Sequence, residues 1–333
     1  MIDIFVFDID GTLTDRRNGE IPDSIDDAIK QLKSHKNTII IATGRPPFEV
    51  SSEIKRRLQP DAIVYNNGKL VTDAQGKVLH EDPIEETLLK SSLERIHKLS
   101  WDCGLHLRDH TLILKGTSIQ QKIFDLTGKK AKARMAKNES INEPVFNIMV
   151  HVEDQQALDD FLCDFPTFKA EAFAPHYYDL YPHGVTKAAG VEVVLKLKHA
   201  TWSRVMAFGD NLNDLEMLKK AYYGFMMEDG HPDLKKEKGL HVAKASSEDG
   251  IVKALMKHGL IEHADNRFDW IRFKHRFVTT LMRYTLPISG FLMISVLYDQ
   301  MRGAFSATTG TNLVLSLILL SSSIYEVIRE EKH

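Results

Sequence analysis

Short apolar runs rich in β-branched and aromatic residues recur along the first part of the chain. Each run is followed by a segment whose apolar residues have helical spacing. This alternation predicts a parallel sheet covered by helices, that is, an α/β protein with a Rossmann-like core. The predicted strands are 2–9, 38–42, 62–65, 204–208 and 241–243, and the predicted helices are 24–35, 53–58 and 213–221.

Residues 82–181 interrupt this alternation. Their pattern predicts an α+β insert with a hairpin around Asp109 and His110 and a helix near Gln120. The other elements predicted for the insert are helices over 85–99 and 155–165 and a strand over 145–152. We therefore expect a core built from residues 1–81 and 182–262 and one inserted domain, 82–181.

Polar residues follow four of the predicted strands. Asp8 lies at the end of the first strand and Asp10 directly after it, before a Gly-Thr turn, and Thr43-Gly44-Arg45 follow the second strand. The third strand is followed by 66–68 and the fourth by 209–214, which includes Asp210, Asn213 and Asp214. Ligands of open α/β sheets bind at the carboxyl ends of the strands, so these four loops should converge on one site.

The residue types in these loops point to Mg²⁺-assisted phosphoryl transfer. Four carboxylates without a neighbouring His or Cys suit Mg²⁺, which prefers oxygen ligands and often shares them with a substrate phosphate. The backbone amides at Gly44 and in the turn after Asp8 can cradle phosphate oxygens. A carboxylate can then act as the nucleophile and form an aspartyl-phosphate.

These motifs resemble those of the haloacid dehalogenase superfamily, and within it the Cof-type phosphatases. The D-x-D-G-T motif stands at 8–12, the second motif at Thr43, and the fourth at 209–214. The lysine of the third motif corresponds best to Lys187, with Lys196 and Lys198 as competitors. The resemblance covers roughly residues 1–262 and implies that the insert is an α+β cap that selects the substrate.

The resemblance also implies a role for each site residue. Asp8 would be the nucleophile and Asp10 the general acid and base. Asp214 would support the site from behind. The expected Mg²⁺ ligands are Asp8, Asp10 through its backbone carbonyl, and Asp210, and the expected phosphate-binding residues are Ile9 (through its amide), Thr43, Gly44, Arg45, Lys187 and Asn213. The substrate would be a small phosphorylated metabolite such as a sugar phosphate, a nucleotide or a cofactor phosphate.

Several alternatives stay open at this stage. Residues 66–68 are either a simple hairpin turn or a ligand contact. The aromatic residues Phe173, Tyr177, Tyr178 and Tyr181 fit a cap core better than a base-stacking platform. A phosphomutase or a non-catalytic scaffold on the same fold would be the alternative functions. An ion pump of this fold is disfavoured, because Asp10 supplies an acid and base that a pump lacks.

After Gly259 the composition changes. Aromatic and cationic residues alternate over 269–283, and apolar runs follow at 284–298 and 304–325, the latter about 33 Å long as a helix. We expect 263–333 to form a helical hydrophobic hairpin that attaches the protein to a membrane through 270–325, with the catalytic part on the cytoplasmic, inner face. The alternative is a hairpin packed on the body or in a homodimer interface.

Composition narrows the function classes further. The chain has 333 residues and a net charge of −3, so it lacks the basic excess of a dedicated nucleic-acid binder, and we expect no nucleic-acid partner. Its N-terminus has no signal-peptide pattern. The two cysteines, Cys103 and Cys163, are predicted to be buried thiols in a reducing cytosol.

Overall fold

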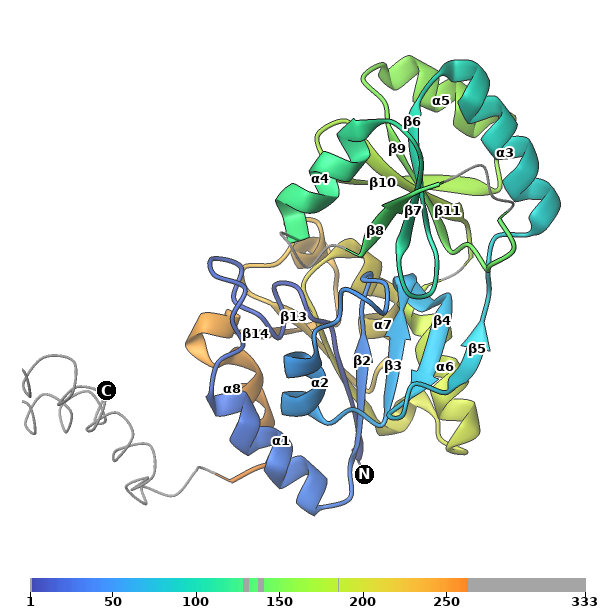
Figure 1. Cartoon of the computed structure of the whole chain (residues 1–333). Helices are drawn as coiled ribbons and strands as arrows, with labels where there is room; N and C mark the ends of the chain where they lie inside the picture. Colours follow the sequence, from blue (N-terminus) through green and yellow to red (C-terminus); the bar gives the residue numbers. More distant parts are fainter. Residues whose placement is uncertain (1, 128–131, 137–140, 185, 263–333) are drawn as a thin grey trace, which may run out of the picture. The chain divides into compact units, whose positions relative to one another are not determined.

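The computed structural model describes residues 2–127, 132–136, 141–184 and 186–262, and no helix within these ranges is long and apolar enough to cross a membrane. Residues Met1–His263 form one compact unit (Figure 1). The predicted hydrophobic hairpin, 263–333, and the predicted membrane attachment through 270–325 lie outside the described residues.

The larger of two sheets has eight strands in the order β14-β13-β12-β1-β2-β3-β4-β5. Its strands are β1 (Ile4–Phe7), β2 (Thr38–Ala42), β3 (Ala62–Tyr65), β4 (Leu70–Asp73), β5 (Val78–Glu81), β12 (Val205–Gly209), β13 (Tyr223–Met227) and β14 (His241–Ala243). The stretch from β14 to β3 is parallel, with β1 in register between β12 and β2. Because β1 is covered on both faces, its four residues are all apolar and buried.

The sheet is mixed, whereas the sequence pattern predicted a parallel one. Strands β4 and β5 were not predicted, and they extend the sheet by antiparallel pairing next to β3. The cause lies in the turn after β3, where Asn66, Asn67 and Gly68 have φ values of 48°, 55° and 111°. These left-handed conformations reverse the chain, so β4 returns beside β3. Residues 66–68 are therefore a hairpin turn.

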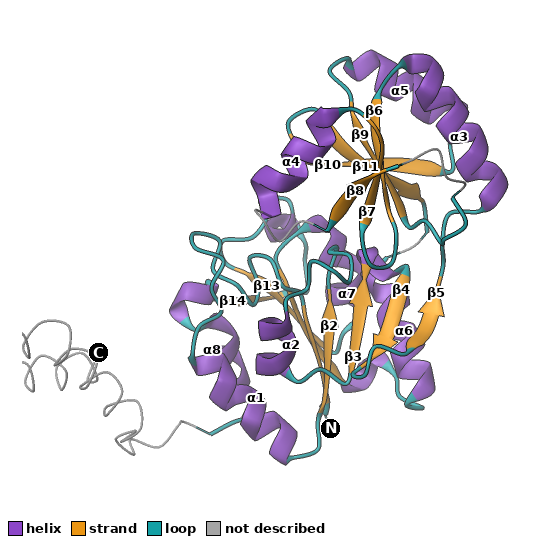
Figure 2. Ribbon diagram, in the orientation of Figure 1, coloured by secondary structure: helices purple, strands orange, loops and turns teal. Residues whose placement is uncertain are grey.

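Helices cover both faces of this sheet (Figure 2). They are α1 (Ser24–Ser34), α2 (Ser52–Leu58), α6 (Lys187–Leu197), α7 (Leu215–Lys220) and α8 (Gly250–Lys257). The apolar residues of α1, α2 and α8 pack with Phe5 and Phe7 of β1, and those of α6 and α7 pack with Ile4 and Val6. Each fully buried side chain of this kind contributes about 1.5–3 kcal/mol, so the two faces of β1 anchor both layers.

The smaller sheet has six strands in the order β10-β11-β9-β6-β7-β8. Its elements are α3 (Glu86–Leu99), β6 (Asp102–His106), β7 (Thr111–Lys115), α4 (Thr117–Thr127), β8 (Ala133–Met135), β9 (Asn147–His151), α5 (Gln155–Asp164), β10 (Phe168–Ala174) and β11 (Tyr177–Pro182). Apolar residues of α3 and α5 pack on one face of the sheet, and Ile119 and Ile123 of α4 pack on the other. The predicted hairpin at Asp109 and His110 is confirmed as the turn between β6 and β7.

The structure bears on two predictions about buried side chains. The aromatic residues of β10 and β11 do belong to the packing of the smaller sheet, with Tyr181 only 1% exposed. Cys103 is buried as predicted, but the prediction for Cys163 is wrong, because this thiol is exposed. Helix α5 turns Leu158 and Phe161 inward, which places Cys163 on the solvent side.

Candidate active site

Three loops of the candidate site begin where neighbouring parallel strands end. Asp8 follows β1, Thr43 follows β2 and Asp210 follows β12. The fourth part of the site is the start of helix α6, where Lys187 lies. The hydroxyl of Thr186 accepts a hydrogen bond from the backbone N–H of Ala189 at 3.2 Å and so caps this helix. The topology thereby gathers residues almost 200 positions apart at one sheet edge.

A buried lysine joins two carboxylates at the base of the site. Lys187 Nζ lies 2.6 Å from Asp8 Oδ1 and 2.7 Å from Asp214 Oδ1. All three side chains are at most 5% exposed. The competing lysines, Lys196 and Lys198, lie at the opposite end of α6 and are exposed. The structure therefore places Lys187 beside Asp8.

Burial and charge act against each other in this cluster. Burial, together with repulsion from Asp214 and Asp210, raises the pKa of Asp8 well above its usual value although Lys187 opposes the shift. Burial disfavours the charged ammonium of Lys187, but the carboxylates of Asp214 and Asp8 outweigh it and raise the pKa of Lys187. The two carboxylates thus favour the cationic form of Lys187 beneath Asp8.

Asp214 also supports the loop that carries Asp210. Its Oδ2 accepts hydrogen bonds from the backbone N–H groups of Asp210, at 2.9 Å, and Asn211, at 3.0 Å. The side chain of Asp214 is fully buried and touches no part of the cavity described below. It therefore fixes the positions of both Asp210 and Lys187 from behind.

The carboxylates of Asp8, Asp210 and Asp214 lie close enough together to share a cation, with one oxygen of each within 4.8 Å of the others. Asp210 also accepts a hydrogen bond from Thr12 Oγ1 at 3.2 Å and pairs with Arg16. Burial and the neighbouring Asp214 raise the pKa of Asp210 to about 6, against the effect of Arg16. Negative charge thus remains crowded here, and an all-oxygen donor set of this kind fits Mg²⁺.

Asp10 lies at the rim of the same edge, with its side chain 58% exposed. Arg45 holds it through two contacts, one of which is 2.8 Å from Nε to Oδ2. The backbone N–H of Arg45 donates to Thr43 Oγ1 at 3.1 Å, so the loop after β2 sets the direction of the Arg45 side chain. Arg45 and Asp8 line the same cavity, which is described below.

Asn67 completes the rim between the loops. Asn213 Nδ2 donates to Asn67 Oδ1 at 3.0 Å, which ties the turn after β3 to the loop after β12. A side chain at Gly44 would have its Cβ 3.2 Å from the same Asn67 oxygen. Residues 66–68 are therefore a hairpin turn that also places Asn67 at the site. Contact of this segment with a ligand stays a prediction.

A cavity of about 540 Å³ opens above these groups. Seven predicted site residues line it, namely Asp8, Asp10, Gly44, Arg45, Lys187, Asp210 and Asn213. Ile9, Thr43 and Asp214 lie behind the lining, and the side chain of Ile9 is part of the hydrophobic core. The structure thus brings the predicted residues together in two layers.

Sequence reasoning missed other residues of the site. Arg16 pairs with Asp210, and Glu49 lines the cavity from the segment between β2 and α2. The smaller sheet contributes His106, Glu171 and Asp179, as well as apolar side chains. Glu171 and Asp179 stand in segments where alternate residues face the same way, and this period of two would have been the signal.

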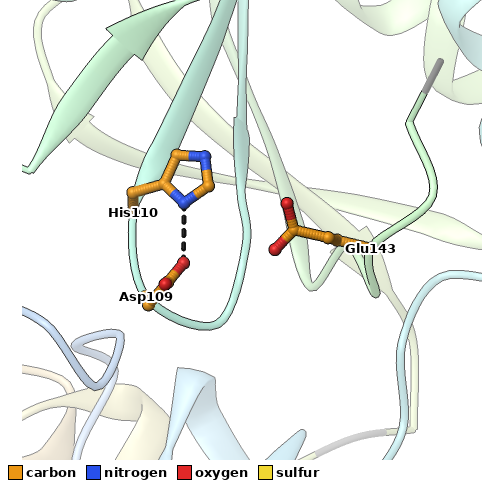
Figure 3. Close-up of side chains that lie close together, drawn as sticks. All are labelled: Asp109, His110 and Glu143. Carbon is orange, nitrogen blue, oxygen red and sulfur yellow. Dashed lines mark hydrogen bonds and ion pairs between the residues drawn. The ribbon is translucent and has the colours of Figure 1, made fainter. Parts of the chain in front are cut away.

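A second acidic cluster lies in segments that connect strands of the smaller sheet and consists of Asp109, His110 and Glu143 (Figure 3). His110 Nδ1 is 2.6 Å from Asp109 Oδ1, and Arg134 Nε donates to His110 Nε2 at 3.0 Å. Both ring nitrogens are therefore engaged, and His110 offers no lone pair to a metal ion in this arrangement.

Comparison with known proteins decides the family. A model of the haloacid dehalogenase-like hydrolases matches residues 5–255. The chain belongs to this family. This hydrolase is 27% identical to the Bacillus subtilis protein YkrA over 267 residues, which cover 78% of this chain and 98% of YkrA.

Two further relatives of this haloacid dehalogenase-like hydrolase are named for an activity. The 5-amino-6-(5-phospho-D-ribitylamino)uracil phosphatase YitU of Bacillus subtilis is 26% identical over 77% of this chain and 97% of YitU. The solved structure of BT4131, a sugar phosphatase of subclass IIB, is 25% identical over 78% of this chain and all of that chain, with a TM-score of 0.68. Together with the family match, these similarities identify the chain as a Cof-type phosphatase.

Proposed function

We propose that the protein hydrolyses a phosphate monoester of a small metabolite in a Mg²⁺-dependent reaction that passes through an aspartyl-phosphate on Asp8. The observation that carries the proposal is the buried contact of 2.6 Å between Lys187 Nζ and Asp8 Oδ1 at the base of the cavity. The ammonium stabilises the anionic form of Asp8 and binds one of its oxygens, so the other is available for attack.

In the first half of the reaction, a carboxylate oxygen of Asp8 attacks the phosphorus and the bond from phosphorus to the ester oxygen breaks. Asp10 gives its proton to the departing oxygen, so the leaving group departs as an alcohol. Arg45 orients Asp10 at the rim of the cavity before the substrate arrives. The phosphate of the substrate then competes for the same guanidinium.

In the second half, Asp10 takes a proton from a water molecule, whose oxygen attacks the phosphorus. The bond between Asp8 and phosphorus breaks, which releases inorganic phosphate and restores the Asp8 carboxylate. Lys187, Asn213, the Thr43-Gly44 loop and the amide of Ile9 would hold the phosphoryl oxygens in both halves. Asp8, the backbone carbonyl of Asp10 and Asp210 would hold Mg²⁺, which neutralises charge between the phosphate and the carboxylates.

The substrate class follows from the size of the cavity and from the relatives. About 540 Å³ accommodates a phosphorylated small molecule. The names of two relatives refer to a phosphorylated ribitylaminouracil and to a sugar phosphate, and both are phosphate monoesters of this size class. A phosphomutase would transfer the phosphoryl group to a second substrate hydroxyl instead of water, and a scaffold would not need the pair of Asp8 and Lys187.

Phosphate release from a panel of phosphate monoesters tests the proposal. Wild type, Asp8→Asn and a control, Asp233→Asn, are compared with and without Mg²⁺. Asp233 is exposed and pairs with Lys236 on the surface, so its substitution controls for the loss of a carboxylate. We expect turnover that requires Mg²⁺, persists in Asp233→Asn and vanishes in Asp8→Asn. Equal turnover by Asp8→Asn would refute the role of Asp8.

The sequence of residues 263–333 motivates a second, separate part of the proposal. We infer from the apolar runs at 284–298 and 304–325 that this segment attaches the phosphatase to the inner face of a membrane. Flotation of the full chain with liposomes, beside a chain that ends at Glu262, tests this. Recovery of the full chain away from the liposomes would contradict attachment and favour the homodimer alternative, which the oligomeric state of both chains would reveal.

A further inference from the structure

The cavity has two chemically different halves. One half holds the phosphoryl-transfer residues described above. The other, which we call the acidic half, consists of Glu49, His106, Glu171 and Asp179. Met149 and Phe173 are among the apolar side chains beside it. Arg45 of the first half donates to the backbone carbonyl of Glu49 at 3.2 Å. None of the four residues of the acidic half is itself a lysine or an arginine, so the part of a substrate that leaves with the ester oxygen would meet mainly carboxylates.

The smaller sheet aligns these residues on one face. In its register Glu171 of β10 pairs with Asp179 of β11, which in turn pairs with Met149 of β9. Directly paired residues of antiparallel strands project on the same side of a sheet. The two carboxylates therefore lie side by side. Met149 is the next residue in this row, and it belongs to the apolar cluster that also includes Ile113.

Glu49, in the segment between β2 and α2, lines the same cavity as this row. Burial and the nearby Asp179 raise the pKa of Glu49, although His106 and Arg45 act in the opposite direction. Burial also raises the pKa of Asp179 to about 7, against the effect of Lys69. Glu49 and Asp179 thus repel each other across the cavity, and a cation between them would remove the repulsion.

The charge of the acidic half is only partly neutralised from within the protein. Lys69 is fully buried behind the cavity wall, where its Nζ donates to the Phe146 carbonyl at 2.6 Å and to Asn147 Oδ1 at 3.0 Å. Tyr181 donates its hydroxyl hydrogen to one oxygen of Glu171. A side-chain hydrogen bond with Asn147 lowers the pKa of Asp179, but its Oδ1 has no hydrogen-bond partner among the described residues.

His106 provides independent evidence that the acidic half binds a ligand. It is only 6% exposed, lines the cavity, and its Nδ1 has no hydrogen-bond partner within the described part of the chain. Burial lowers the pKa of His106, so the ring is neutral at physiological pH and can exchange a hydrogen bond with a hydroxyl group. A buried polar nitrogen without a partner is unfavourable unless a ligand satisfies it.

We propose that the acidic half recognises a leaving group that carries a protonated amine together with hydroxyl groups, so that the substrate is the phosphate monoester of an amino sugar or amino alcohol. The ammonium lies between Glu49 and Asp179, and a hydroxyl reaches His106. A second phosphate or a carboxylate in the leaving group is repelled by the same three carboxylates. This inference rests on the proposed phosphatase function, because it names the substrate of the same cavity.

A matched pair of probes tests the inference. Glucosamine 6-phosphate and glucose 6-phosphate have nearly the same size and differ in the ammonium group. We expect kcat/KM to be about tenfold higher for the amine, since one charge-assisted hydrogen bond contributes that much. Glu49→Gln and Asp179→Asn should each bring the ratio close to one. Glu53→Gln, at an exposed position of α2, should leave the ratio unchanged.

Calorimetric binding of the same two probes to Asp8→Asn separates this inference from the proposed function. Turnover of both probes with equal kcat/KM and equal affinity would overturn the inference and leave the phosphatase intact. If the amine binds more tightly but wild type turns over neither probe nor p-nitrophenyl phosphate, the phosphatase proposal is overturned and the cation site is retained. Expected instead are preferential binding and preferential turnover of the amine.

Discussion

Lys187 Nζ lies 2.6 Å from Asp8 Oδ1 at a place where neither side chain is more than 5% exposed. The pair joins the start of α6 to the end of β1, and the two residues lie 179 positions apart in the sequence. Removal of one member of a buried ion pair is strongly unfavourable, because the other charge stays behind without compensation. Lys187 is therefore expected to matter for stability as well as for chemistry.

Replacement of Lys187 by Met should lower the free energy of unfolding by about 3–5 kcal/mol at pH 7. The carboxylates of Asp8 and Asp214 would then be buried without their cation. Lys196→Met provides the matched control, because this lysine is exposed on the same helix and its loss should change stability by less than about 0.5 kcal/mol. Urea denaturation of both variants measures the difference, and equal midpoints would contradict the account.

Magnesium should stabilise the folded protein through Asp210. At a free concentration of 100 times its Kd, Mg²⁺ would add about 2.7 kcal/mol to the stability. Asp210→Asn should remove most of this effect, because Asp210 is one of three clustered carboxylates, whereas the exposed Asp233→Asn should retain it. Thermal unfolding with and without Mg²⁺ gives the answer, and the same shift in all three proteins would exclude Asp210 as a ligand.

The turn at Gly68 should prove essential for the position of Lys187. A Cβ at Gly68 would collide with the Thr186 carbonyl, directly before α6, and φ is +111°. At Gly76, φ is +86° but a Cβ would meet nothing within 4 Å. Both Gly→Ala variants should lose about 1–2 kcal/mol for the backbone conformation, and Gly68→Ala roughly 2 kcal/mol more for the collision.

The two glycine variants should also differ in activity. Displacement of α6 by Gly68→Ala moves Lys187, and kcat should fall on the order of 100-fold, since small errors in positioning have effects of this size. Gly76→Ala should keep the wild-type kcat. Steady-state kinetics on one phosphate monoester decides between them, and unchanged kcat in both variants would mean that the contact between the turn and α6 does not position the lysine.

The stability of the protein should decrease between pH 4 and pH 8 because of Asp179. Its pKa is raised to about 7 in the folded state, so from about pH 4 to 7 the folded protein holds a proton that the unfolded chain has lost. Folding is therefore favoured at low pH and weakened as pH rises through 7. Asp179→Asn should be more stable than wild type at pH 8 by on the order of 2 kcal/mol.

Denaturant unfolding of Asp179→Asn across this pH range provides the measurement. The exposed Asp159→Asn on α5 is the control and should follow the wild-type pH dependence. A pH profile of Asp179→Asn that parallels that of wild type would contradict the burial of an anionic Asp179. The predicted gain in stability also fits a residue that is kept for substrate recognition at the expense of folding.

The larger sheet could be predicted because its central strands are buried on both faces. Residues 4–7 and 38–42 are nearly continuous apolar runs, and the polar residues that follow them mark the site. Strands β10 and β11 escaped prediction because charged residues such as Glu171 and Asp179 interrupt their pattern. These charged residues line the cavity. The residues that obscure the strand pattern in the sequence are therefore residues of the candidate site.

Pairings between distant residues were the other part that sequence could not supply. The family motifs favoured Lys187 over its competitors Lys196 and Lys198, but its contact with Asp8 depends on the packing of α6 against the turn after β3. The contacts of Arg16 with Asp210 and of Asn67 with Asn213 depend on how separate loops meet at the sheet edge. Local patterns contain no information about such meetings.

The most direct test of the central claim is to trap the phosphoryl group on Asp8. With p-nitrophenyl phosphate, whose leaving group needs no proton, Asp10→Asn should complete the first half of the reaction and stall before water attacks. Acid quenching and mass spectrometry should then find the peptide that contains Asp8 heavier by one phosphoryl group, and the same peptide unmodified in the double variant Asp8→Asn, Asp10→Asn. Release of p-nitrophenol without any phosphorylated Asp8 would contradict the account.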